Sequence, residues 1–176
     1  MLYEFNIAIL GNSFFTMSSK SKSREVADMN DIGIAYSDLK VLVIDDEAAI
    51  RDMIQEMLDT LDVGSITQAI DGLSGLEAIS QSRPDLVFCN IHMKPLDGLS
   101  FLKLVRGAKE KWIHELPIVF VTGDNFLDTV KTASQHHVDG YLVKPFDFEQ
   151  LKLQVDLILL RINQHARGLL VSGSTA

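Results

Sequence analysis

The sequence lacks three features that would place it in several common classes of protein. A single cysteine among 176 residues excludes a disulfide within the chain and gives no sign of an oxidising compartment. Lys and Arg number 16 against 24 Asp and Glu, and the resulting net charge of −8 disfavours nucleic-acid binding. No apolar run reaches the roughly 18 residues that a membrane-spanning helix requires. We therefore expect a cytoplasmic protein that binds neither nucleic acid nor membrane.

Length and composition predict one folded domain with an extension at each end. Hydrophobic residues make up 47% of the chain and charged residues 23%, which is typical of a globular protein. Residues 1–38 include the polar, basic stretch 18–24, which has no apolar periodicity, so we expect a largely disordered N-terminal extension. We expect the domain itself over residues 39–163 and a C-terminal tail over residues 164–176.

Five short apolar runs rich in β-branched residues alternate with helical patterns. In most of these runs apolar residues follow one another without alternating with polar ones. This pattern indicates strands buried on both faces of a parallel sheet. They cover residues 40–45, 65–70, 85–90, 117–122 and 140–145. The stretches between them show apolar spacing of three and four residues, most weakly at 125–136, and a last helix is predicted from Phe148 to about Ile162. This order predicts an α/β fold, a doubly wound five-stranded parallel sheet with helices on both faces.

In such sheets, functional sites lie at the carboxyl ends of the strands, near the topological switch point. Polar residues occupy those ends in order along the chain: Asp45, Asp46, Glu47, Asn90, Thr122 and Lys144. Adjacent carboxylates suit a hard divalent cation such as Mg²⁺. A lysine and a hydroxyl across from them suit the oxygens of a phosphoryl group. Each residue alone has an ordinary structural explanation, for example helix capping, but their joint occurrence at successive strand ends favours a site.

Four sequence blocks carry a resemblance to a known family. The blocks VLVIDDE, NIHMKPLDGLSFL, PIVFVTG and GYLVKPF resemble the signature motifs of the receiver domains of two-component response regulators, including the chemotaxis regulators. The resemblance covers residues 39–162 and implies the flavodoxin-like receiver fold. It also implies that Asp45 and Asp46 organise Mg²⁺, with the backbone carbonyl of His92 as a further ligand.

The same resemblance implies roles for three residues beyond the metal ligands. Thr122 would be the switch hydroxyl that meets the phosphoryl group, and Tyr141 would be the aromatic switch that turns inward with it. Lys144 would pair with the phosphoryl group. A histidine kinase or a histidine phosphotransfer protein would be the partner that delivers this group.

Asn90 departs from the family pattern, because receiver domains carry the phosphate-accepting aspartate at this position. The lone pair of an amide nitrogen is delocalised, so Asn90 is a poor nucleophile and no acyl phosphate can form on it. Its amide oxygen can still coordinate a cation, but the loss of one negative charge predicts weaker Mg²⁺ binding. We therefore expect phosphotransfer to be lost and the chain not to be an enzyme.

Two explanations of Asn90 remain open from the sequence. The chain is either a natural pseudo-receiver that works by binding, or an ordinary receiver in which aspartate was replaced by design. The intact neighbours of Asn90 are an argument for the second explanation, but the sequence does not decide between the two. In both cases we expect a single-domain receiver that signals through protein contacts, in a homodimer or with an output protein, through the fourth helix, fifth strand and fifth helix.

Two functions from other classes compete with the receiver interpretation. A small Mg²⁺-dependent phosphatase or phosphotransferase could use the same acidic residues, but Asn90 would not supply its nucleophile. A flavin-binding redox module has the same fold class, but it would need a phosphate-binding loop, and here that position holds the carboxylates of Asp45, Asp46 and Glu47.

Overall fold

The computed structural model of the protein describes residues 9–10, 13–14, 34–123 and 138–172. The chain divides into two units, Met1–Gly33 and Ile34–Ala176. The first contains β1 (Ile9–Leu10) and β2 (Ser13–Phe14), which pair antiparallel. The second contains every other described element and carries the candidate site.

The second unit is built around five parallel strands, which confirms the predicted fold class. Their order in the sheet is β4-β3-β5-β6-β7. The strands are β3 (Lys40–Ile44), β4 (Ser65–Ala69), β5 (Leu86–Asn90), β6 (Ile118–Thr122) and β7 (Gly140–Val143). From β3 the chain first adds β4 on one side and then β5 on the other. The strand order therefore reverses between β3 and β5, and this is the topological switch point of the sheet.

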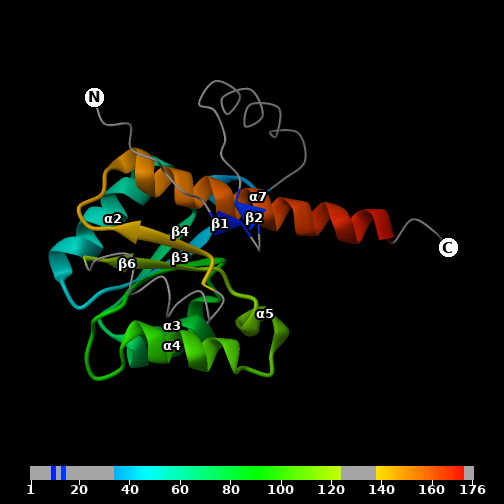
Figure 1. Ribbon diagram of the computed structural model, residues 1–176. Coiled ribbons are helices and arrows are strands. Elements are labelled where there is room, and N and C mark those ends of the chain that lie inside the picture. The colour runs from blue at the N-terminus through cyan, green and yellow to red at the C-terminus, as the bar shows by residue number, and fades with distance from the viewer. Residues whose placement is uncertain (1–8, 11–12, 15–33, 124–137, 173–176) are drawn as a thin grey trace. The chain divides into compact units, whose positions relative to one another are not determined.

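Helices cover both faces of this sheet (Figure 1). One face carries α2 (Ala48–Thr60) and α7 (Phe148–Ser172), and the other carries α3 (Gly72–Ser82) and α4 (Gly98–Arg106). The short helices η1 (Tyr36–Asp38) and α5 (Lys111–His114) lie in connections. The helix predicted at 125–136 lies outside the described residues. In the described part of the chain, no helix has both the length and the apolar character needed to cross a bilayer.

The last helix extends further than its sequence pattern indicates. The apolar stripe predicts an end near Ile162, and residues 164–176 are interpreted as a tail, but α7 continues to Ser172. The residues that follow Ile162 contain no proline, so each of their backbone N–H groups is able to donate within the helix. Most of the predicted tail is therefore helical.

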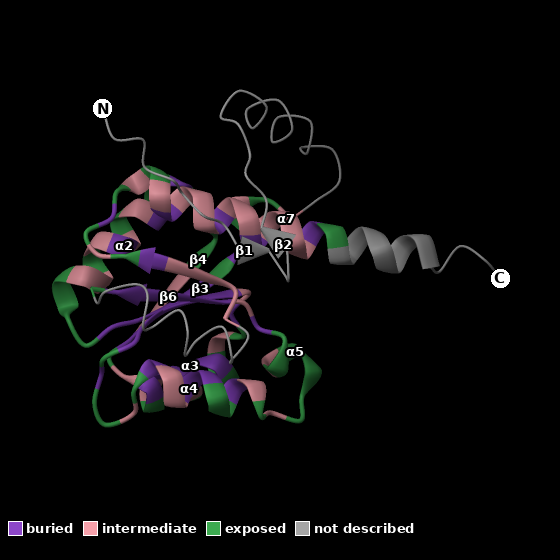
Figure 2. Ribbon diagram, in the orientation of Figure 1, coloured by how far each residue is buried: buried purple, intermediate pink, exposed green. Residues whose placement is uncertain are grey.

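Neighbouring residues of each central strand face opposite layers of helices. In β3, Leu42 and Ile44 belong to the cluster under α3 and α4, whereas Val41 and Val43 belong to the cluster under α2 and α7. Every residue of β5 and β6 is buried, and the strands form the purple centre of Figure 2. Burial on both faces explains why these strands read as continuous apolar runs.

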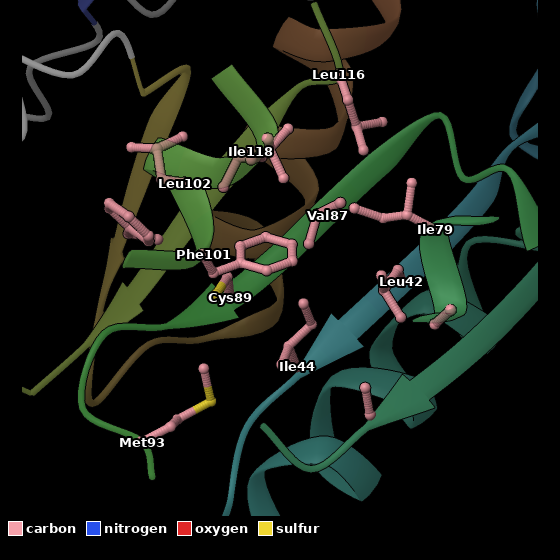
Figure 3. Packing of buried hydrophobic residues seen from close by; sticks show 14 of the residues in the cluster. Leu42, Ile44, Ile79, Val87, Cys89, Met93, Phe101, Leu102, Leu116 and Ile118 are labelled. Carbon is pink, nitrogen blue, oxygen red and sulfur yellow. The ribbon is translucent and has the colours of Figure 1, made fainter. Parts of the chain in front are cut away.

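The cluster under α3 and α4 contains the single cysteine of the chain. Figure 3 shows Cys89 beside Phe101 of α4, with Val87 further along the same strand. Cys89 is fully buried, and this burial raises the pKa of its thiol. A thiol in this state behaves as a small hydrophobic side chain.

The chain just before β3 is held against α7. The buried side chain of Asn163 accepts a hydrogen bond from the backbone N–H of Ile34 at 2.7 Å. The Tyr36 hydroxyl donates to Asp156, and Lys152 Nζ donates to that hydroxyl at 3.1 Å. These contacts explain why the second unit begins at Ile34 and not at residue 39, where the strand pattern starts.

Candidate functional site

The predicted site residues come together at the carboxyl edge of the sheet. β3, β5, β6 and β7 are successive neighbours in the sheet and are parallel, so the residues at their ends share that edge. Asp45 follows β3, Asn90 ends β5 and Lys144 follows β7. We refer to Asp45, Asp46, Glu47, Asn90 and Lys144 as the acidic site.

Asp45 is the buried anchor of the acidic site, with only 1% of its surface exposed. Its Oδ2 accepts a hydrogen bond from Lys144 Nζ at 2.9 Å. Its Oδ1 accepts from the backbone N–H of Glu47 at 3.0 Å and from Asn90 Nδ2 at 3.3 Å. A buried carboxylate is stable only when it is paired and hydrogen-bonded, and these three donors satisfy that requirement.

The amide nitrogen of Asn90 contacts three oxygens at once. Nδ2 lies 3.0 Å from Asp46 Oδ1, 3.2 Å from the backbone oxygen of His92 and 3.3 Å from Asp45 Oδ1. These are the oxygens that the sequence predicts as metal ligands, and they converge on one atom. In the described part of the chain, no group of three or more His, Cys, Asp or Glu side chains could hold a metal ion. The oxygens around Nδ2 comprise two carboxylates and one backbone carbonyl.

The loop after β5 turns the carbonyl of His92 toward the acidic site while the His92 side chain is exposed. The loop closes through a hydrogen bond from the Gly98 N–H to the Ile91 oxygen at 2.9 Å. A Cβ at position 98 would lie 2.3 Å from the backbone oxygen of Asn90, so only glycine permits this approach. Asp97 then begins α4 by accepting a hydrogen bond from the Ser100 N–H at 2.7 Å.

Glu47 differs from the other acidic residues that begin helices. Asp71 and Asp97 cap α3 and α4 by accepting hydrogen bonds from backbone N–H groups. Glu47 occupies the same position before α2, but its side chain makes no capping hydrogen bond there and pairs with Lys144 Nζ at 3.3 Å. The carboxylate of Glu47 is therefore directed to the acidic site, which the simple capping explanation does not account for.

Thr122 and Tyr141 lie where the strand assignments place them. Thr122 ends β6, is 1% exposed, and its backbone oxygen accepts a hydrogen bond from the N–H of Lys144 at 2.7 Å. Tyr141 lies in β7 with its ring centroid 6.2 Å from that of Phe120. Burial raises the pKa of Tyr141 to about 12. The switch roles of both residues stay predictions.

Arg51 is a site-supporting residue that the sequence interpretation missed. It lies on α2 and donates from one guanidinium nitrogen to the backbone oxygen of Asp45 at 2.8 Å. Its Nε donates to Gln68 of β4 at 3.1 Å, and Gln68 donates to Gln55 of α2 at 2.7 Å. A single arginine on a helix carries no motif, so the sequence contains no signal that would have identified this contact.

Comparison with known proteins gives consistent matches. The response regulator receiver domain family matches residues 41–156. The chemotaxis protein CheY-3 of Vibrio cholerae is 30% identical over 129 residues, which cover 73% of this chain and 98% of that protein. The chemotaxis protein CheY of Pseudomonas aeruginosa is 32% identical over 125 residues, with 71% and 99% covered.

Solved structures agree with the sequence matches. A crystal structure of NtrX from Brucella abortus superposes with a TM-score of 0.67 at 29% identity, covering 77% of this chain and 29% of that chain. The structure of CheY4 of Vibrio cholerae gives 0.63 at 27% identity, covering 69% and 98%. The matches thus cover the smaller relatives almost over their whole length.

The parallel sheet, its strand order and its acidic carboxyl edge define the class of the molecule as a receiver-type signalling module. The chain belongs to the response regulator receiver domain family, which confirms the family that the sequence motifs indicate. Receiver domains act in two-component signalling with histidine kinases and output domains, are generally not enzymes, and generally bind Mg²⁺ among their acidic residues.

Proposed function

We propose that this chain is a receiver module that acts through protein–protein contacts and does not accept a phosphoryl group at position 90. The observation that carries the proposal is the side chain at the end of β5. Position 90 has the place of the family's acceptor, but it holds an amide whose nitrogen donates to Asp46 Oδ1 at 3.0 Å. The nitrogen lone pair of an amide is delocalised, so it does not attack phosphorus. Position 90 therefore lacks the nucleophile that phosphorylation requires.

The proposed partners are those of a cytoplasmic two-component pathway. A histidine kinase or a histidine phosphotransfer protein would dock at the carboxyl edge of the sheet. A second copy or an output protein would bind through β7, α7 and the helix predicted at 125–136. The apolar side chain of Val143 on β7 is 38% exposed, and Leu153 and Leu157 on α7 are partly exposed, which supports a contact surface there.

Mg²⁺ would be held by oxygens from three parts of the chain. The Asp45 and Asp46 carboxylates and the His92 carbonyl fit this role because they converge within 3.3 Å of one atom. The side chain of Asn90 would join them through Oδ1 after its amide group rotates. When bound, the cation would neutralise charge on a phosphoryl group. Because Asn90 brings no charge, we expect weaker binding than in a receiver with aspartate at this position.

Phosphorylation by a small donor tests the proposal directly. The protein and its Asn90→Asp variant are incubated with Mg²⁺ and acetyl phosphate, and both are weighed by intact mass spectrometry. We expect only the variant to gain one phosphoryl mass, because it restores a carboxylate nucleophile among otherwise intact neighbours. Gln164→Glu, which adds a carboxylate at an exposed position of α7, is the matched control and should gain nothing.

Two other outcomes would change the conclusion. A gain of mass by the unmodified chain would show that a group other than residue 90 accepts phosphate and would overturn the proposal. No gain by either protein would show that the acidic site has lost more than its acceptor, and the role as a binding module would then stand without any link to phosphotransfer.

A further inference from the structure

The amide group of Asn90 has one favourable orientation in the acidic site. Its three neighbours, Asp45 Oδ1, Asp46 Oδ1 and the His92 oxygen, are all hydrogen-bond acceptors. With the amide reversed, Oδ1 would face these oxygens and be repelled by them. Because three acceptors lie 3.0 to 3.3 Å from Nδ2, which carries two N–H groups, these two groups are shared among the three.

The other hydrogen-bond donors of the acidic site do not occupy the position of the Asn90 amide. Lys144 contacts the other oxygen of Asp45, Oδ2, and divides its charge between Asp45 and Glu47. The contacts to Asp45 Oδ1 come from N–H groups, those of Asn90 and Glu47. Asn90 is only 7% exposed and Asp45 only 1%, so protein donors must satisfy the buried Oδ1 of Asp45.

From this geometry we propose that the amide nitrogen of Asn90 takes the place of a divalent cation and organises the acidic site without metal. The inference rests on the proposed function and deepens it. A cation can bind between these oxygens only after Nδ2 leaves them and Oδ1 turns toward them. Asn90 thus weakens metal binding twice, by removing a charge and by supplying a competing donor. The acidic site then keeps one arrangement at Mg²⁺ concentrations that would fill the site of a receiver with aspartate at position 90.

Thermal unfolding with and without metal tests this idea. The melting temperatures of the whole protein and of its Asn90→Asp and Asn90→Ala variants are measured by circular dichroism in EDTA and in excess Mg²⁺. We expect the unmodified protein to change by less than about 1 °C, because its oxygens already have donors. Asn90→Asp should melt lower in EDTA, where like charges meet, and should rise by about 5 °C or more with Mg²⁺.

The two variants separate loss of the donor from a change of charge. Asn90→Ala adds no charge but removes both N–H donors, so it should also melt lower in EDTA and recover in part with Mg²⁺. A cavity alone would lower its melting temperature equally in both conditions. Gln164→Glu, with the same added charge at an exposed position, should behave as the unmodified protein does in both conditions.

The outcomes distinguish this inference from the proposed function. A rise of the unmodified protein with Mg²⁺ that equals the rise of Asn90→Asp would overturn the inference, even if phosphorylation behaves as proposed. The inference would be supported if Mg²⁺ leaves the melting temperature of the unmodified protein unchanged and raises that of both variants, even if no variant is phosphorylated. Equal losses by Asn90→Ala with and without Mg²⁺ would count against it, because only packing would then have changed.

Discussion

The two ends of the parallel sheet each hold a nearly buried carboxylate, but the charges around the two differ. At the amino end, just before β7, the side chain of Asp139 is 7% exposed. It accepts hydrogen bonds from Arg106 and from the Ile118 N–H, both at 2.8 Å, and pairs with Arg161. We refer to these four residues as the Asp139 cluster. One carboxylate therefore meets two guanidinium groups there.

The Asp139 cluster joins the two layers of helices. Arg106 belongs to α4 and Arg161 belongs to α7, which lie on opposite faces of the sheet. Arg106 also donates to the backbone oxygens of His114 and Leu116 at 3.0 and 2.9 Å. Its charge and its donors are thus used within the fold, which indicates a structural role.

The acidic site has the opposite balance of charge. Its one lysine is shared by Asp45 and Glu47, and Asp46 adds a further exposed carboxylate. An excess of negative charge at a partly open edge costs stability, and a bound cation would reduce that cost. The comparison teaches that two buried carboxylates in one sheet can differ widely in how far their charge is neutralised, so burial of a carboxylate alone does not mark a site.

The largest effect is expected from Asp139→Ala. The substitution removes the acceptor of the Ile118 N–H and the carboxylate that pairs with Arg106 and Arg161. We therefore expect a loss of about 3 kcal/mol in the free energy of unfolding. Urea unfolding measures it. Asp59→Ala, on the exposed face of α2, is the control and should cost less than about 0.5 kcal/mol. Equal losses in the two variants would show that the Asp139 cluster does not hold the layers together.

A smaller loss is expected from Lys144→Met at the other end of the sheet. It removes the cation from Asp45, which is 1% exposed, so the carboxylate loses its charged partner. We expect a loss of about 2 kcal/mol by urea unfolding, because Asn90 and Glu47 still donate to the other oxygen. Lys94→Met, at an exposed lysine in the loop after β5, should be nearly neutral. A loss above that of Asp139→Ala would reverse the comparison.

The sequence predicted the acidic site better than the Asp139 cluster for a physical reason. In a parallel sheet, the residues that end successive strands meet at one edge, so Asp45, Asn90 and Lys144 could be placed together from strand positions alone. Arg106 and Arg161 come from helices on opposite faces, and Asp139 precedes a strand. Nothing in the spacing of three such residues indicates that they meet.

Details within the site also lay beyond the sequence. The resemblance assigns Lys144 to a phosphoryl group, but its partners in the structure are Asp45 and Glu47. The orientation of the Asn90 amide depends on three oxygens, one of them from the backbone, and no sequence pattern encodes it. The contact between Asn163 and Ile34 joins residues that are far apart in the chain, so periodicity could not show that the folded unit begins before β3.

The smallest effect is expected from Tyr141, which lies in β7, the strand between Asp139 and Lys144. Burial raises its pKa from the ordinary 10.0 to about 12, so between these values the folded protein keeps a proton that the unfolded chain releases. The free energy of unfolding should therefore fall as pH rises through this window. We expect a fall of about 1 kcal/mol near pH 11, because solvent screens a ring that is only partly buried. Tyr141→Phe has no such proton, so urea unfolding near pH 9 and pH 11 should show a shallower fall. Parallel falls in the two proteins would mean that the phenol of Tyr141 titrates alike in the folded and unfolded chains.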